Sequence, residues 1–192
     1  MKVAVLLMAA AVASQAGSGT KAQSDQFQQK IQQIVDNGNT PAKTVRRTTV
    51  TQGEANAYLK VRGPELLPVG VTDATVAAVG SGQLNGRAVV DLDVIREKRG
   101  SGGLLDPKTY MTGRLPVTAS GILHTTNGKA RFELQSATVA GIPIPKTFLQ
   151  DIVSYYTRSS DYPNGINLDQ VYELPANIKE IQVGQGNAIV VQ

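Results

Sequence analysis

From Val69 onward, apolar and polar residues alternate with a period of two, which limits this part of the chain to antiparallel strands. In Val90–Val94 the valines and the leucine occupy one face and two aspartates occupy the other, as in a half-buried strand. The stretches Tyr110–Thr125 and Lys129–Ala140 continue the alternation. We therefore expect the middle of the chain to form a sheet with one apolar face.

Turn signals divide this strand-rich region. Asn127-Gly128 is the clearest type I′ hairpin signal in the chain, and Asn85-Gly86 marks a second hairpin. Arg96–Pro107 is charged and rich in glycine, so we expect a long loop there. Gly141–Pro145 breaks the alternation, because its prolines lack the N–H that a sheet ladder needs.

Three segments are predicted to be helical. Ser24 can cap a helix that runs to about Asn37–Gly38. Thr51-Gln52-Gly53-Glu54 matches a capping box, which predicts a short helix that Gly63-Pro64 stops. Pro145 can stand at the start of a third, amphipathic helix.

Together these elements predict an α+β fold. Further strands at Lys43–Thr51, Ile178–Val183 and Ala188–Val191 bring the total to about six or seven antiparallel strands. The chain has no repeat of fixed period and no interior linker, so we expect residues 23–192 to form a single domain. A domain of about 170 residues buries roughly 70% of its unfolded surface, which is enough for a core without disulfides.

The N-terminus has the pattern of a secretory signal peptide. Lys2 precedes the apolar run Val3–Ala13, and small and polar residues follow. The apolar run is shorter than the roughly 20 residues that span a bilayer, so we expect residues 1–22 to be removed rather than retained as an anchor. Cleavage can follow Ala13, Ala16 or Ala22. The chain is therefore predicted to be exported to a periplasm or beyond.

Composition excludes most familiar chemistry. The chain has one histidine, no cysteine and no tryptophan, so thiolate nucleophiles, zinc clusters and redox pairs have no side chains to use. We expect no catalytic residue, no metal and no cofactor. The net charge is only +4, and loss of Lys2 and Lys21 with a signal peptide reduces it, so nucleic acid is not an expected partner.

Two groups of polar residues are weak candidates for chemistry. Asp91 and Asp93 share one face of a predicted strand, where acid–base catalysis could use them, but a solvated sheet face explains them better. His124 ends a strand just before a turn and has no partner at ligand spacing, which favours an exposed imidazole. A hydrolase that uses the two aspartates is therefore a third functional hypothesis, behind the two given below.

The order of elements resembles a known group of proteins. The residues that carry the resemblance are the Thr-x-x-Glu helix ending in Ala57-Tyr58-Leu59, the Leu67-Pro68 step, the Gly-Ile-Pro-Ile-Pro break at 141–145, and the tail Leu174-Pro175, Ile178, Ile181, Val183, Gly186 and Ile189. Over about Thr48–Val191 the chain is similar to the tubular lipid-binding (TULIP-like) proteins and to the small bacterial LmeA/YpmS-type extracytoplasmic proteins. The resemblance implies a strongly curved antiparallel sheet packed around amphipathic helices, with an apolar groove for acyl chains and no catalysis. The chain has three Phe and six Tyr, so such a groove would be aliphatic.

Our leading hypothesis is therefore an exported cell-envelope protein that binds a lipid or another apolar ligand between a curved sheet and a helix. Peripheral contact with a membrane is compatible with it. The alternative is a structural module that binds a protein partner through a sheet face or edge. The expected groove residues come from the helix after Pro145 and from two strands. Plain core packing explains the helix stripe slightly better, and the two interpretations are compatible because a groove wall is also core. The expected groove residues are Phe148, Leu149, Ile152, Val153, Tyr156, Leu115, Val117, Phe132 and Leu134.

Overall fold

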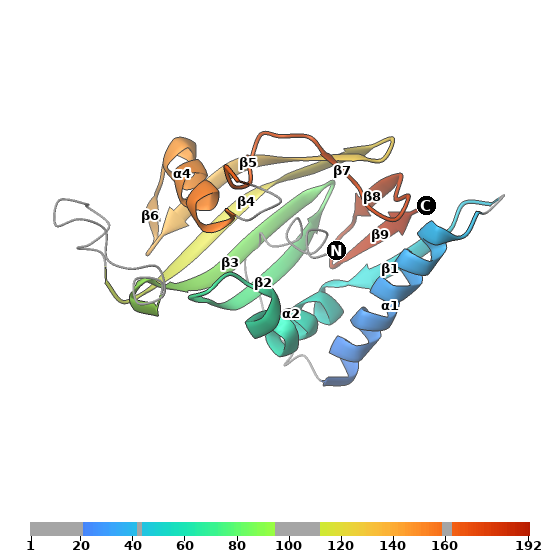
Figure 1. Ribbon diagram of the computed structural model, residues 1–192, viewed down its shortest axis with the longest axis horizontal. Helices are drawn as coiled ribbons and strands as arrows, with labels where there is room; N and C mark the ends of the chain where they lie inside the picture. Colours follow the sequence, from blue (N-terminus) through green and yellow to red (C-terminus); the bar gives the residue numbers. More distant parts are fainter. Residues whose placement is uncertain (1–20, 42–43, 95–111, 159–162) are drawn as a thin grey trace.

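The computed structural model describes residues 21–41, 44–94, 112–158 and 163–192 (Figure 1). It confirms the α+β fold. The helices are α1 (Lys21–Asn39), α2 (Gln52–Leu66) and α4 (Lys146–Tyr156). The strands are β1 (Arg47–Thr51), β2 (Val71–Gly80), β3 (Gln83–Asp91), β4 (Arg114–Thr126), β5 (Lys129–Val139), β6 (Ile142–Pro143), β7 (Tyr172–Glu173), β8 (Glu180–Val183) and β9 (Asn187–Val191). The predicted loop Arg96–Pro107 lies outside the described residues.

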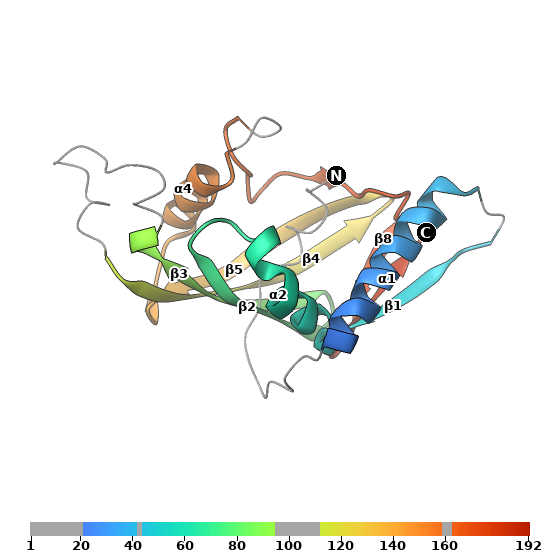
Figure 2. The same ribbon diagram turned by 60° about the horizontal axis from the view of Figure 1, so that its bottom comes forward.

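The strands form two antiparallel sheets. The small sheet has the order β1-β9-β8, and the large sheet has the order β2-β3-β4-β5-β6, with β7 also paired to β5. Strand β8 lies against one end of the large sheet, because Thr125 Oγ1 bonds both the N–H and the C=O of Ile181, and Gly82 donates to Val183 O. The two sheets thus meet in one bent, open structure (Figure 2).

One of the two predicted hairpin turns is correct. Asn127 and Gly128 connect β4 to β5 with φ values of 49° and 77°. The turn predicted at Asn85-Gly86 is wrong, because both residues lie inside β3, where β2 and β4 pair with them on either side. Ser81 and Gly82 make that turn instead, with φ values of 52° and 81°. Pairing along the whole of β3 therefore outweighs the local preference of an Asn-Gly pair.

Helix boundaries differ from the predictions at two places. Ser24 is not a cap, because α1 already includes Lys21, and Ser24 is buried within the helix. The capping box of α2 is confirmed: Glu54 N donates to Thr51 Oγ1, and Thr51 N donates to a Glu54 carboxylate oxygen. Pro64 does not stop α2. It lies in the last turn, and Leu67 N closes that turn on Gly63 O at 2.8 Å.

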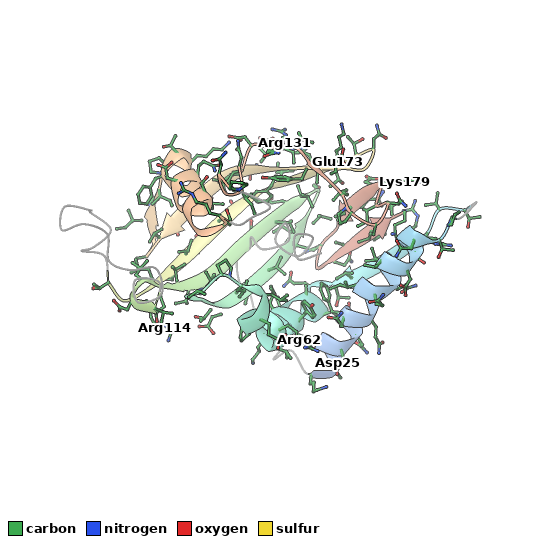
Figure 3. All side chains as sticks on the ribbon, in the orientation of Figure 1. Asp25, Arg62, Arg114, Arg131, Glu173 and Lys179 are labelled. Atoms are coloured by element: carbon green, nitrogen blue, oxygen red, sulfur yellow. The ribbon has the colours of Figure 1, made fainter. Side chains whose placement is uncertain are left out.

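The core lies where the small sheet, α2 and one end of the large sheet meet. Its buried members are Val76, Leu84, Leu123, Ala130, Ile178, Ile181, Val183 and Val190. A second cluster holds α1 in place, with Phe27 stacked on Tyr58 at a ring-centroid distance of 4.9 Å and Val50 beside them. We call the end of the large sheet next to this core the near half, and the end that carries Arg114 the far half (Figure 3).

Side chains of α2 close part of the open edge of the large sheet. Asn56 accepts from Val76 N at 2.6 Å and donates to Val76 O at 2.8 Å, as a neighbouring strand would. Gln52 accepts from Ala78 N at 3.0 Å. These amides satisfy main-chain groups that an edge strand otherwise leaves open to other chains.

Candidate functional site

The strand register brings many apolar residues onto one face of the large sheet. Residues directly opposite each other in antiparallel strands share a face. We call this set the apolar face: Val71, Val76 and Ala78 of β2; Leu84, Gly86, Ala88 and Val90 of β3; Leu115, Val117, Ala119, Gly121 and Leu123 of β4; and Ala130, Phe132, Leu134, Ala137 and Val139 of β5.

The opposite face is polar along β4 and β5. Hydroxyl groups pair across the strands, with 2.6 Å between the Thr118 and Thr138 oxygens and 2.8 Å between those of Ser120 and Ser136. His124 continues this row and lies 3.0 Å from a Glu133 carboxylate oxygen, exposed as the sequence indicated. The sheet is therefore amphipathic, and only one of its faces suits an apolar ligand.

Coverage of the apolar face changes along the strands. In the near half, Leu84 and Leu123 are buried beneath α2 and the small sheet. In the far half, Val90, Leu115 and Val117 are only half-buried, as is Thr118, which points to the opposite side of the sheet. These three apolar side chains in the far half are thus less buried than Leu84 and Leu123 in the near half.

Small residues form a row across the middle of the apolar face. Gly86 lies opposite Ala119, which in turn lies opposite Ala137. Larger residues stand on both sides, with Leu84 and Leu134 toward the near half and Val117 and Val139 toward the far half. Gly86 and Ala137 are buried and Ala119 is half-buried, so this row lies where the covered part of the apolar face passes into the open far half.

Bulges bend the sheet around this face. The β2 register shifts between Thr72 and Thr75, where Asp73 has a φ of 52°. A second shift passes over Gln135, so that Leu134 and Ala137 face the same side although strict alternation would separate them. Bulges increase local bending and twist, which gives the sheet the curvature seen in Figure 2.

Helix α4 lies over the far part of β5 (Figures 1 and 2). Among the helix side chains that the structure describes, Leu149 is buried, Val153 is half-buried, and Phe148 is 43% exposed. The side chains of the other two predicted helix residues, Ile152 and Tyr156, lie outside what the structure describes. The described residues of the apolar stripe predicted on this helix therefore differ in burial, because Phe148 is exposed whereas Leu149 is buried.

The segment after α4 is fastened to the helix by Gln150. Its side chain donates to Ile166 O at 2.9 Å and accepts from Leu168 N at 2.7 Å. Thr157 Oγ1 accepts from Ile166 N at 2.7 Å. Helix and segment thus form one unit. Strand β6, before the helix, and β7, after the segment, both pair with β5 and join this unit to the large sheet.

The four predicted strand residues all lie on the apolar face but are spread along it. Leu115 and Val117 are in the far half, while Phe132 packs against the core and Leu134 lies opposite Gly121. Val117 and Gly121 are separated by roughly 13 Å at about 3.3 Å per residue. These residues therefore border an open surface and do not converge on one enclosed pocket.

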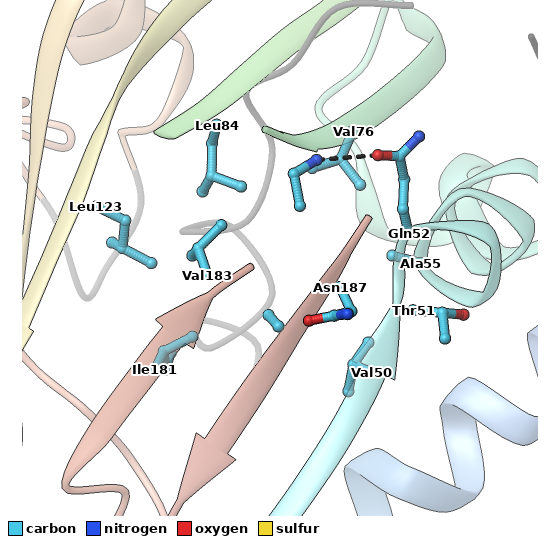
Figure 4. Close-up of a pocket in the computed structure, with 12 residues that line it drawn as sticks. Val50, Thr51, Gln52, Ala55, Val76, Leu84, Leu123, Ile181, Val183 and Asn187 are labelled. Atoms are coloured by element: carbon cyan, nitrogen blue, oxygen red, sulfur yellow. Dashed lines mark hydrogen bonds between the residues drawn. The ribbon is translucent and has the colours of Figure 1, made fainter. Parts of the chain in front are cut away.

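The structure also has a small cavity of about 40 Å³ between the two sheets (Figure 4). It is lined by Val50, Thr51, Gln52, Ala55, Val76, Ala78, Leu84, Leu123, Ile181, Val183, Asn187 and Ala188, none of which was predicted as a groove residue. Ligand pockets usually measure roughly 300–1,000 Å³, so this cavity holds no more than a water molecule or two. This cavity is therefore too small for an apolar ligand, and the open far half is the larger apolar surface among the described residues considered above.

The two aspartates do not share a strand face. Strand β3 ends at Asp91, and residues 92–94 are helical. Asp91 Oδ1 accepts from the N–H groups of Asp93 and Val94 at 3.1 and 3.2 Å, which is the contact of a helix cap. Asp93 accepts from Gly113 N at 2.9 Å. The expected alternation over Val90–Val94 is therefore wrong, because Asp91 ends the strand by capping the next turn.

Two further observations concern the described residues. They contain no group of three His, Asp or Glu side chains placed to hold a metal ion. No helix among them combines the length and the apolar character needed to cross a bilayer.

Comparisons with known proteins identify no family. No protein-family model matches the chain, and no curated protein sequence matches it. Among solved structures, the chain is similar to a crystal structure of a lipopolysaccharide binding protein, with 16% sequence identity and a TM-score of 0.23. That alignment covers 76% of this chain and 40% of the other, so this chain spans well under half of the protein it matches.

Proposed function

We propose that this protein is an exported cell-envelope protein that binds lipid or another apolar ligand, without catalysis, on the far half of its apolar face. The observation that carries the proposal is a continuous apolar surface, bordered by α4, whose residues are only half-buried. Monomeric proteins rarely leave such surfaces open without a use.

The energetics of this site suit an acyl chain. Burial of about a dozen methylene groups at roughly 0.8 kcal/mol each gives a gross gain near 10 kcal/mol, before the costs of ordering and association. The half-buried side chains of Leu115, Val117 and Val139 would contact such a chain, and Ala119 lies at its inner end. The surface offers shape and apolar contact, which are all that such binding needs.

The proposal is tested by placing a bulky side chain on the apolar face. Protein purified from an envelope should carry lipid that native mass spectrometry detects, and Ala119→Phe should lower the bound fraction about tenfold, a loss of about 1.4 kcal/mol. Ala77→Phe is the matched control, because Ala77 is on the opposite face of β2. Wild-type protein that repeatedly emerges from the envelope without lipid would rule the function out.

A second function, binding of a protein partner by strand addition, is favoured by the outer edge of β1. Arg46 and Gln192 exchange main-chain hydrogen bonds, so even-numbered residues of this segment face β9. Within the described part of the chain, the outward main-chain groups of Thr49 have no hydrogen-bond partner. An added strand could use them.

Proline substitution tests this second function. Thr49→Pro removes only an outward N–H and should abolish stoichiometric pull-down of a partner while leaving thermal stability nearly unchanged. Thr48→Pro is the contrasting variant, since it breaks the ladder with β9 and should destabilise the fold. Pull-down that survives Thr49→Pro would exclude the edge as the binding site.

A further inference from the structure

We infer that the far end of the large sheet docks on a lipid bilayer through an apolar tip formed by Ile142, Pro143, Pro145 and Phe148. This inference rests on the proposed lipid-binding function and identifies where lipid would enter. Ile142 is 68% exposed and Phe148 is 43% exposed, and both prolines are exposed as well. The tip is at the end of the molecule opposite the small sheet (Figure 1).

Main-chain hydrogen bonds fix the conformation that exposes the tip. Ala140 and Gly141 turn the chain with φ values of 50° and 81°. Ala140 N donates to Pro116 O at 2.7 Å, and Ile144 N donates to Ala137 O at 3.0 Å. These bonds fix both sides of the turn, so that Ile142 is presented outward by hydrogen-bonded backbone.

The tip is unsuited to strand addition by a protein. β6 has two residues, and one of them, Pro143, has no N–H to offer a neighbouring strand. Pro145, which begins the next helix, has none either. The tip therefore offers side chains rather than a hydrogen-bonding edge.

Most of the charged side chains that the structure describes near the tip are paired within the protein, although Asp151 of α4 is exposed. Lys146 pairs with Asp169, and Arg114 lies 3.3 Å from Asp73 and 4.0 Å from Asp91. Figure 3 shows Arg114 at this end of the sheet. An apolar surface with mostly paired charges around it matches the boundary between headgroups and acyl chains better than it matches a highly charged partner.

The tip also continues directly into the proposed ligand site. Ile142 lies opposite Val139, and Val139 lies opposite Val117 on the apolar face. A lipid that leaves a bilayer at the tip therefore meets apolar side chains without a gap on its way to the far half.

The absence of tryptophan from the chain allows a direct test. Phe148→Trp places one indole in the tip, and its emission should shift to shorter wavelength when vesicles of neutral phosphatidylcholine are added. Val171→Trp is the control, because Val171 is 52% exposed outside the tip. The shift should persist at high salt, since apolar contact is not screened as surface charge is.

Vesicle flotation provides the second measurement. The double variant Ile142→Asp, Phe148→Asp should lower the bound fraction about tenfold relative to wild type, whereas Val171→Asp should not. Both changes are at exposed positions, so circular dichroism should show an unchanged fold. Wild-type protein that binds no vesicles, or binds only anionic vesicles at low salt, would overturn the inference.

Failure of docking can be told apart from failure of the proposed function. Protein that carries envelope lipid but never binds vesicles contradicts the docking tip alone. Protein that binds vesicles through the tip but never carries lipid contradicts the ligand site alone.

Discussion

At the scale of single residues, Glu54 joins three parts of the fold. Its carboxylate accepts Lys30 Nζ of α1 at 2.7 and 2.8 Å and the main-chain N–H of Thr51 at 2.8 Å. Burial raises the pKa of Glu54, but the hydrogen bonds from Lys30 and Thr51 outweigh it, and the net pKa lies below the model-compound value of 4.5. The stability that Glu54 contributes is therefore present above pH 4.5 and is lost as the pH falls through its lower folded pKa.

We expect Glu54→Gln to lower the free energy of unfolding at pH 7 by about 1.5–3 kcal/mol, because the hydrogen bonds lose their charge. Urea denaturation at a series of pH values should also show a weaker decline in acid than the wild type shows. Glu65→Gln is the control, since the Glu65 side chain is largely exposed and only loosely paired with Arg62. If the free energy of unfolding declines in acid to the same extent in Glu54→Gln and in the wild type, this explanation is wrong.

Two glycines should respond in opposite ways to alanine. A Cβ on Gly38 would clash with the main-chain oxygen of Ala176, so Gly38→Ala should cost about 1–3 kcal/mol as the end of α1 moves away. Gly53 is in the first turn of α2, and a Cβ there meets only ordinary contacts with Gln23 and Thr51, so Gly53→Ala should stabilise by about 0.5–1 kcal/mol. Thermal unfolding of both variants tests the pair, and equal shifts would show that the close approach at Gly38 is absent.

At the scale of elements, the amide side chains along α2 protect the edge of β2. Asn56→Asp keeps an acceptor for Val76 N but loses the donor to Val76 O, at a cost of about 1–3 kcal/mol. Hydrogen exchange should speed up in the part of β2 around Val76. Gln52→Leu should instead affect the amide of Ala78, which bonds to Gln52. Exchange that is unchanged at both amides would show that α2 does not protect this edge.

The sequence predicts local features of these elements well. The capping box at Thr51 and the turn at Asn127-Gly128 rest on neighbouring residues and are correct. The amphipathic pattern of β4 likewise places Leu115 and Val117 on one face. The bulge at Gln135 could not be predicted, because it depends on how β5 registers against β4. The helical turn after Asp91 was missed because its aspartates also fit a strand.

At the scale of the whole molecule, the candidate site depends on contacts that no local pattern reveals. The near half of the apolar face is buried because β8 and the core residues near it pack there, and no sheet of the described residues covers the far half in the same way. Periodicity identifies an apolar face, but it does not tell which half of the face the rest of the chain covers. Phe132, predicted as a groove residue, lies against the core for this reason.

Ligand binding on the far half should raise thermal stability by mass action. Addition of a long-chain fatty acid to delipidated protein should raise the melting temperature in proportion to the logarithm of its concentration. The Ala119→Phe variant should show little of this shift, while Ala77→Phe should behave as wild type. A shift that is equal in both variants would place the ligand elsewhere.

The pairing of β1 with β9 has a consequence for the timing of folding. Arg47 lies opposite Val191, so β1 and β9 can pair only after all the residues between them have been synthesised. Contacts so distant in sequence form slowly, because a long loop must close before they contribute. A chain that is still being synthesised therefore cannot complete its core early. This delay would keep the chain unfolded, as translocation requires, during the export that we propose.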